Sequence, residues 1–198
     1  MAIYFVNGSG TNTPPYSSNV SGATNFTNLV GGVTLVDGDI IEVVDGTEII
    51  NSAAIVALTA DVTIRSWSSN TGTPVVRAPL SDPLFTLAGP NYTIQNLHMF
   101  KTGPSAAGPI IRFDGAGASS EISGNQFSVS NETGSTAVGI DTQDKTFSGT
   151  LTIRNNKFRR LVKGVNVGLL VPSPIAVKAD YYDRMMTEDF PFRDYTSN

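Results

Sequence analysis

Short runs in which apolar and polar residues alternate recur along this chain at nearly constant intervals. Four segments share one pattern of apolar positions, namely residues 61–67, 92–100, 120–127 and 151–158. Aligned on Ile64, Ile94, Ile122 and Ile153, they are separated by steps of 30, 28 and 31 residues. Short alternating runs predict β-strands, and their recurrence at this period with polar turns between them is typical of a solenoid.

The aligned positions predict how the interior of such a solenoid is built. Parallel strands of successive coils stack about 4.8 Å apart, so like residues should form ladders. We expect one wall of the four isoleucines and a second wall of Val76, Ile111, Ile140 and Val165. Asn125 and Asn156 lie three positions after their isoleucines, and Phe127 and Phe158 lie five after, which predicts an asparagine stack at a corner and a phenylalanine stack inside. The segment at Ile94 instead carries Asn96 two positions on, so we expect its turn to differ.

The two ends of the chain depart from the repeat. Ala23, Phe26, Leu29 and Val30 precede Gly31-Gly32 at helical spacing, which predicts a short helix that caps the open core. After Val167 the pattern stops, and the remaining residues are expected to form an extended arm. The sequence therefore predicts an N-terminal strand and cap (1–37), a parallel β-helix of about five coils (38–168) and a C-terminal arm (169–198).

The amino-acid composition excludes several classes of function. Charged residues make up 15% of the 198 residues, against roughly 25% in an average globular protein. The net charge of −4 argues against a broad nucleic-acid surface, and the absence of cysteine excludes disulfides and thiolate chemistry. No N-terminal signal peptide and no apolar run of membrane-spanning length is present, so we expect a soluble chain made in the cytoplasm, with no cofactor.

Two motifs connect the repeat with a known superfamily. The segment from Gly38 to Gly46 (Gly-Asp-x-Ile-x-Val-x-Asp-Gly) and the Ile-x-x-Asn-x-Phe lines resemble the first coil and the repeat of right-handed parallel β-helix proteins of the pectin-lyase-like superfamily. The resemblance covers about residues 3–167. It implies the all-β fold, but it specifies function poorly, because polysaccharide-cleaving enzymes and viral structural proteins both use this fold.

Acidic residues supply the candidates for catalysis. Asp114 and Asp141 each follow a matching strand, so we expect them on one edge of neighbouring coils, with Arg112 close by. Such a carboxylate pair could serve a glycosidase, and the alternative is that both cap turns. Asp37, Asp39, Glu42 and Asp45 could likewise hold calcium or simply serve turns. His98, the only histidine, is expected to point outward from its strand.

Basic residues supply the candidates for partner binding. Five of the thirteen bases, with no acid among them, fall on the last coil: Arg154, Lys157, Arg159, Arg160 and Lys163. The acids of the C-terminal region complement them, namely Asp180, Asp183, Glu188, Asp189 and Asp194. The same region carries aromatic residues suited to gripping a neighbouring subunit, namely Tyr181, Tyr182, Phe190, Phe192 and Tyr195. Blunting of the final sheet edge by charge is an alternative role for the bases.

These features favour a non-enzymatic structural protein. We expect a bacteriophage virion accessory protein, such as a capsid cement, decoration or tail-associated protein. It would form a homo-oligomer, with a trimer favoured, and contact virion proteins such as the major capsid protein. The alternatives are a polysaccharide lyase or glycoside hydrolase, and a glycan-binding adhesin module.

Overall fold

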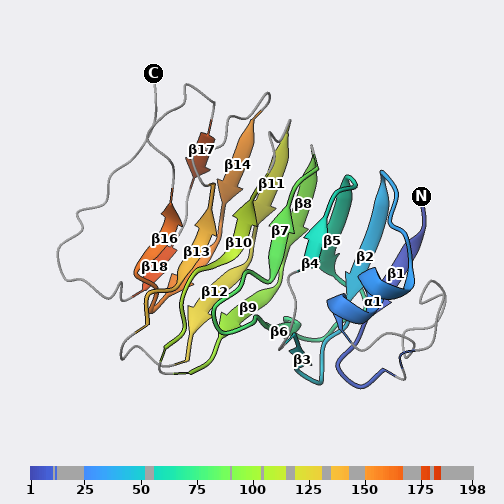
Figure 1. The fold of residues 1–198 in the computed structure, drawn as a ribbon, viewed down its shortest axis with the longest axis horizontal. Helices are drawn as coiled ribbons and strands as arrows, with labels where there is room; N and C mark the ends of the chain where they lie inside the picture. The colour runs from blue at the N-terminus through green and yellow to red at the C-terminus, as the bar shows by residue number, and fades with distance from the viewer. Residues whose placement is uncertain are drawn as a thin grey trace.

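Parallel β-strands make up almost all of the regular structure (Figure 1). The computed structural model describes residues 1–10, 12, 25–51, 56–89, 91–103, 105–114, 119–130, 135–142, 150–166, 175–178 and 181–183. Within these ranges the chain is a mostly β parallel solenoid with one short helix, α1. The expected fold class is therefore confirmed at this level.

The strands form three sheets in which every neighbouring pair is parallel. In spatial order, sheet A contains β1 (Ile3–Val6), β2 (Asp39–Val43), β5 (Val62–Ser66), β8 (Tyr92–Gln95), β11 (Ser120–Ser123), β14 (Leu151–Arg154) and β17 (Ile175–Lys178). Sheet B contains β3 (Ile49–Ile50), β6 (Val75–Arg77), β9 (His98–Lys101), β12 (Gln126–Val129), β15 (Lys157–Arg159) and β18 (Tyr181–Asp183). Sheet C contains β4 (Val56–Leu58), β7 (Phe85–Leu87), β10 (Pro109–Phe113), β13 (Val138–Asp141) and β16 (Lys163–Asn166). From β2 onward the chain visits A, B and C in rotation, so each coil adds one strand to each sheet.

The predicted isoleucine wall lies on the inner face of sheet A. The four residues stand in register across β5, β8, β11 and β14, and all are fully buried: Ile64, Ile94, Ile122 and Ile153. Ile41 of β2 extends the same row. Burial of like β-branched side chains above one another gives the coils a continuous apolar core and fixes their register.

The second predicted wall needs one correction. Ile111, Ile140 and Val165 do stand in register in sheet C. Val76 does not join them, because it lies in sheet B opposite Met99. Phe85 of β7 takes the expected place opposite Ile111. Each coil has three strands, and Val76 belongs to the middle one.

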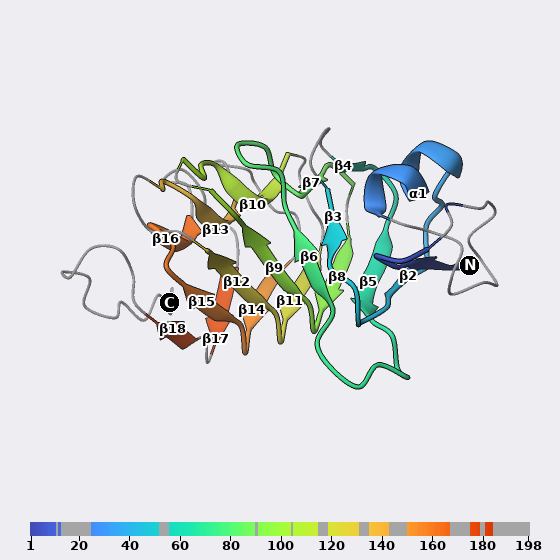
Figure 2. The same cartoon turned by 90° about the horizontal axis from the view of Figure 1, so that it is seen from below.

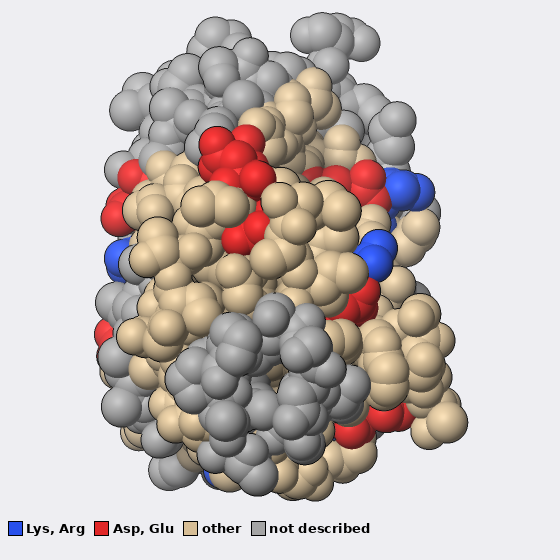
Figure 3. Space-filling model, turned by 90° about the vertical axis from the view of Figure 1, so that its right-hand side faces the viewer, with Lys and Arg blue, Asp and Glu red and all other residues tan. Residues whose placement is uncertain are grey.

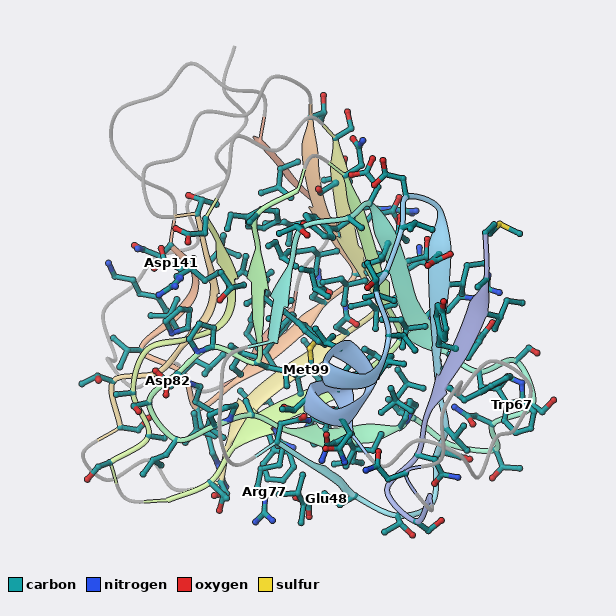
Figure 4. The ribbon with its side chains drawn as sticks, turned by 45° about the vertical axis from the view of Figure 1, so that its right-hand side comes forward. Glu48, Trp67, Arg77, Asp82, Met99 and Asp141 are labelled. Atoms are coloured by element: carbon teal, nitrogen blue, oxygen red, sulfur yellow. The ribbon has the colours of Figure 1, made fainter. Side chains whose placement is uncertain are left out.

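The inner face of sheet B contains the predicted phenylalanine stack. Phe127 and Phe158 are paired in register, with ring centroids 5.1 Å apart and an interplanar angle of 10°. Met99 precedes them in the same row and is also fully buried, as Figure 4 shows for its position inside the coil. The prediction of this stack is confirmed.

The turn between sheets A and B has the same backbone shape in three successive coils. Asn96, Gly124 and Asn155 each lie two residues after the ladder isoleucine, and each has a positive φ, of 58°, 65° and 56°. The prediction that the turn at Asn96 differs is therefore wrong. Asparagine adopts the left-handed conformation more readily than other side-chain-bearing residues, so it replaces glycine here without changing the turn.

A buried asparagine ladder follows these turns. The Asn156 side chain accepts a hydrogen bond from the backbone N–H of Asn125 at 3.0 Å and donates to the Ile122 carbonyl at 2.9 Å. The Asn125 side chain in turn accepts from the backbone N–H of Leu97 at 3.0 Å and donates to the Ile94 carbonyl. These bonds satisfy backbone groups that the turn would otherwise leave buried without partners. The predicted asparagine stack is confirmed.

Helix α1 (Phe26–Gly32) lies at the N-terminal end of the solenoid, beside β4 (Figures 1 and 2). Asn25 caps it by accepting a hydrogen bond from the backbone N–H of Asn28 at 2.7 Å. Phe26 is fully buried and packs edge-on against Phe85, with centroids 4.8 Å apart. The predicted helix is confirmed from residue 26 onward and extends to Gly32, while residues 23–24 lie outside the described residues.

The repeat continues beyond the point where the sequence pattern stops. Strand β17 pairs in parallel with β14, and β18 pairs in parallel with β15. These two strands fall within residues 169–198, the expected C-terminal arm, and they add one more strand each to sheets A and B. The Ile-x-x-Asn-x-Phe line is present here only in altered form, with Val177, Asp180 and Tyr182 at the positions of the isoleucine, asparagine and phenylalanine.

A lysine is enclosed where sheet B turns toward sheet C. Lys101, at the end of β9, is fully buried, and its ammonium group donates to the carbonyls of Ala107 at 2.6 Å and Asp82 at 2.9 Å. Burial lowers the pKa of Lys101 to about 8, and the negative charge of Asp82 opposes this effect. The side chain thus ties two loops of the corner together at the cost of a desolvated charge.

Candidate functional site

The outer face of sheet B carries a groove with a volume of about 400 Å³. Its lining residues come from β6, β9, β12 and β15 and the turns that follow β12 and β15: Val75, His98, Phe100, Gln126, Ser128, Val129, Ser130, Arg159 and Arg160. We call this surface the sheet-B groove. Figure 2 shows its strands side by side across the middle of the molecule.

Register explains why these side chains meet. In β6, β9, β12 and β15 the second residue of the strand points inward, so the first and third residues point outward. One outward row places His98, Gln126 and Lys157 in successive coils. The other outward row places Phe100, Ser128 and Arg159 in successive coils. The solenoid therefore builds a surface of two parallel rows from residues about 30 positions apart.

His98 lines the groove and contacts several of its other residues. Its Nε2 atom lies 2.8 Å from the Ser128 hydroxyl and 3.2 Å from the Gln126 side-chain amide, and its ring centroid is 5.6 Å from that of Phe100. Burial and, second, the positive charge of Arg159 lower the pKa of His98. The described contacts of His98 include no carboxylate, so the Ser–His pair lacks the third group that orients a catalytic base.

Two arginines border the groove. Arg159 is the last residue of β15, and Arg160 follows it with a φ of 57°, a left-handed conformation that is uncommon for a long side chain. The Arg160 guanidinium lies 3.5 Å from the Ser130 carbonyl, across the turns of two coils. None of the described lining residues is acidic. The groove therefore presents adjacent guanidinium groups, which suit carboxylates and other oxyanions.

The five predicted basic residues do not form one patch. Arg159 and Arg160 line the sheet-B groove, and Lys157 lies beside it on the same sheet, opposite Gln126 in register. Arg154 lies on sheet A, where it forms a salt bridge of 2.7 Å with Glu121. Lys163 lies on sheet C and donates to the Asn166 side chain at 3.0 Å. Because one coil winds through three sheets, bases close in sequence are spread around the solenoid.

The predicted acid pair is not brought into matching positions. Asp141 lies opposite Arg112 in the register of β10 and β13, whereas Asp114 lies two residues further along its own coil. Asp141 accepts a hydrogen bond from Asn166 at 2.9 Å, and Asp114 is exposed. Figure 4 places Asp141 on a different side of the molecule from Arg77, which belongs to sheet B. The two residues therefore belong to neighbouring coils of sheet C, as expected, but they are offset by two positions in register, and Arg112 is the residue that stands next to Asp141.

Two buried polar atoms lie next to each other in register on sheet C. Arg112 stands opposite Thr86 of β7, and neither the Arg112 Nε nor the Thr86 hydroxyl has a hydrogen-bond partner. Thr86 is only 5% exposed. An unsatisfied pair of this kind could take an acceptor group, such as a water molecule or a ligand oxygen.

A second groove, of about 560 Å³, runs along the corner where coils enter sheet A. Its polar side chains form a ladder from coil to coil. Asp37 accepts from the backbone N–H of Asp61 at 3.0 Å, Asp61 accepts from that of Asn91 at 2.9 Å, and Asn91 accepts from that of Ser119 at 2.8 Å. These groups are committed to joining coils, as the buried asparagines are on the next corner.

The first-coil acids have similar structural roles. Asp39 is buried and accepts hydrogen bonds from the backbone of Ala2 and Val36. Glu42 forms a salt bridge of 2.7 Å with Arg65, and Asp45 accepts from the backbone of Thr71 and Gly72. Among the described residues, no group of three or more histidines and carboxylates could hold a metal ion.

The C-terminal aromatic candidates are only partly described. Tyr181 and Tyr182 belong to β18, whereas Phe190, Phe192 and Tyr195 lie outside the described residues. Trp67 follows β5 and packs edge-on against Phe5 of β1, with centroids 6.0 Å apart. In the described part of the chain, no helix is long and apolar enough to cross a membrane.

Charge is unevenly distributed along the solenoid axis. Residues 37–60, which contain the first coil, carry five acids and no base, whereas residues 150–166 carry five bases and no acid. Figure 3 looks onto the N-terminal end and shows acidic side chains at several places, with fewer basic ones. The two arginines of the sheet-B groove thus belong to the coil that carries the most positive charge.

Sequence reasoning missed the sheet-B groove, although a signal for it exists. His98, Gln126 and Lys157 lie four positions after their ladder isoleucines. Phe100, Ser128 and Arg159 lie six positions after them. The alignment used for the core would therefore also have predicted the outer rows.

No protein-family model, no curated protein and no solved structure matches the chain.

Proposed function

We propose that the chain is a non-enzymatic structural protein, a bacteriophage virion accessory protein of the capsid cement, decoration or tail-associated kind. Its fold would be a right-handed β-helix of the pectin-lyase-like type, in keeping with the right-handed sense of parallel crossovers. It would be made in the host cytoplasm, assemble as a homo-oligomer, with a trimer favoured, and contact the major capsid protein. It would need neither a cofactor nor nucleic acid.

The observation that carries this proposal is that surface carboxylates form hydrogen bonds and salt bridges between neighbouring coils. Asp37, Asp61 and Glu121 hold backbone or side-chain groups of the adjacent coil. The Glu121 carboxylate also accepts from Ser123 at 2.7 Å and from Gln95 at 3.2 Å. Carboxylates bonded in this way stiffen a rod, whereas an acid–base catalyst needs a carboxyl group with access to substrate.

Association with particles tests the proposal. The full chain should co-sediment with particles that lack it and should raise their resistance to heat or chelation. A chain ending at residue 183 keeps β17 and β18. Any loss of binding by this chain is therefore due to the last fifteen residues and not to the removal of the edge strands. No binding by the full chain to any candidate particle would contradict the proposal.

A polysaccharide lyase, glycoside hydrolase or glycan-binding module is the second candidate. The observation in its favour is the sheet-C cluster, where Arg112 Nε and the Thr86 hydroxyl lack partners beside Asp141. Incubation with acidic and neutral polysaccharides tests cleavage, and a glycan array tests binding. Cleavage by the full chain that is lost in Asp114→Asn and Asp141→Asn would favour the enzyme over the structural protein.

A further inference from the structure

We propose that the sheet-B groove binds residues 188–192 of this chain, Glu-Asp-Phe-Pro-Phe, supplied by the same copy or by a neighbouring one. The inference rests on the proposed assembly role and names the occupant of the groove. Residues 188–192 lie outside the described residues and follow β18 in the chain.

The basic side of the groove fits adjacent carboxylates. Arg159 and Arg160 are consecutive, and Lys157 stands on the same outer face one residue before Phe158. The left-handed backbone of Arg160 brings its guanidinium to the Ser130 carbonyl, at the border of the groove. Glu188 and Asp189 are the only consecutive acids in the chain, and they match this pair in number and sign.

The other side of the groove is apolar. Val75 and Phe100 line it toward the N-terminal coils, and the Phe100 ring lies beside the His98 ring. The two acids of the segment are followed directly by Phe190, Pro191 and Phe192. A proline favours extended backbone in the residue before it, and an extended strip is the shape that a shallow groove on a sheet accepts.

The described end of the chain lies next to the groove. Strand β18 ends at Asp183, which stands opposite Arg159 in register. Glu188 follows Asp183 by only five positions, a reach of roughly 16 Å at about 3.3 Å per residue. The segment can therefore reach the groove of its own copy, and exchange between copies would use the same contacts.

His98 provides a direct reporter, because it is the only histidine in the chain and lies in the groove. Its imidazole C–H resonances can be followed by NMR in the full chain without assigning other residues. The positive charge of Arg159 acts on His98, and the other charged residues on the outer face of the neighbouring strands are Lys157 on β15 and Arg77 on β6, where Arg77 is paired with Glu48 at 3.0 Å. A carboxylate brought into the groove would add the opposite sign.

The experiment compares the full chain with Glu188→Gln/Asp189→Asn. We expect the pKa of His98 to be lower in this variant, because neighbouring carboxylates favour the imidazolium. Asp194→Asn, which removes an acid outside the segment, should leave the titration unchanged. Phe190→Ala/Phe192→Ala should shift the His98 resonances at constant pH. In the background Arg159→Gln/Arg160→Gln, the effect of the acid substitutions should shrink, as expected for coupled sites.

Identical His98 resonances and titrations in the full chain, Glu188→Gln/Asp189→Asn and Phe190→Ala/Phe192→Ala would overturn the inference. If His98 is unaffected but the protein still forms oligomers or binds particles, only the assignment of residues 188–192 to the groove is wrong, and the proposed function stands. Dependence of the His98 shift on protein concentration would assign the segment to a neighbouring copy, and independence would assign it to the same copy.

Discussion

Asn156 fastens its coil to the preceding one by accepting a hydrogen bond from the backbone N–H of Asn125 at 3.0 Å. Both side chains are 1% exposed, so water cannot replace the bonds they make. A single asparagine at the same position of each of these coils thus helps to hold neighbouring coils together.

Replacement of Asn156 by alanine should destabilise the protein. The substitution leaves the Asn125 N–H and the Ile122 carbonyl without these side-chain partners in a buried corner, at about 1–3 kcal/mol for each group. Urea unfolding followed by circular dichroism measures the change. Asn155→Gly is the matched control, because Gly124 already occupies the equivalent position, and it should change the free energy of unfolding by less than about 0.5 kcal/mol. Equal stability of Asn156→Ala and the parent chain would contradict the role of the ladder.

Glycine substitutions should have opposite effects at two positions. At Gly124 the φ is +65° and an added Cβ would collide with the Asn96 side chain, so Gly124→Ala should cost more than about 1 kcal/mol. At Gly31, in α1, an added Cβ meets no atom within 4 Å, so Gly31→Ala should stabilise the helix by up to about 1 kcal/mol. The thermal midpoints of the two variants should move in opposite directions, and movement in the same direction would refute this reading of the turn.

Buried Lys101 should make stability depend on pH in the alkaline range. Its pKa is about 8 in the folded protein against 10.5 ordinarily, so the unfolded chain binds more protons between these values. Stability should therefore rise as the pH increases from 8 to 10.5, by on the order of 3 kcal/mol from this group.

The variant Lys101→Met should lack that rise and should be less stable overall, because it abandons the two carbonyls that the ammonium group binds. Lys163→Met, at an exposed position, should keep the rise. Unfolding curves between pH 7 and 10 provide the comparison, and parallel pH profiles for the parent and Lys101→Met would count against the assignment.

Glu121 should make the stability of the protein depend on pH in the acidic range. The Ser123 hydroxyl and, to a lesser extent, Arg154 lower the pKa of the Glu121 carboxyl. Its stabilising effect is therefore present above the ordinary pKa and is lost as the pH falls through the folded value. Because Arg154 is nearly half exposed, we expect Glu121→Gln to cost less than about 1 kcal/mol at pH 7 and still less in 1 M salt. A loss that is unchanged by salt would indicate packing instead of charge.

The core was predictable wherever one residue type repeats at a fixed offset. Ile94, Ile122 and Ile153 specify sheet A because parallel stacking requires like residues to face each other across coils. Val76 was misplaced because its coil contains a longer connection between sheets, and counting from the isoleucine does not reveal which strand follows. The turn at Asn96 was misread because different residues can adopt one backbone conformation.

The candidate site was less predictable than the core. Outer rows are not held to one chemistry by packing, so His98, Gln126 and Lys157 share a position without sharing a residue type. The basic residues were predicted to form one patch because they are close in sequence. Arg154 and Lys163, however, lie on different sheets from Arg159. Strands β17 and β18 were missed because Val177, Asp180 and Tyr182 replace the isoleucine, asparagine and phenylalanine of the repeat, so a search for the original residue types passes over them.

The mass of the full chain in solution tests the proposed assembly most directly. Light scattering coupled to size exclusion should give a multiple of the 20.9 kDa chain mass, with three copies favoured, and the oligomer should persist on dilution to micromolar concentration. A single species of 20.9 kDa at every concentration and salt condition would contradict the account.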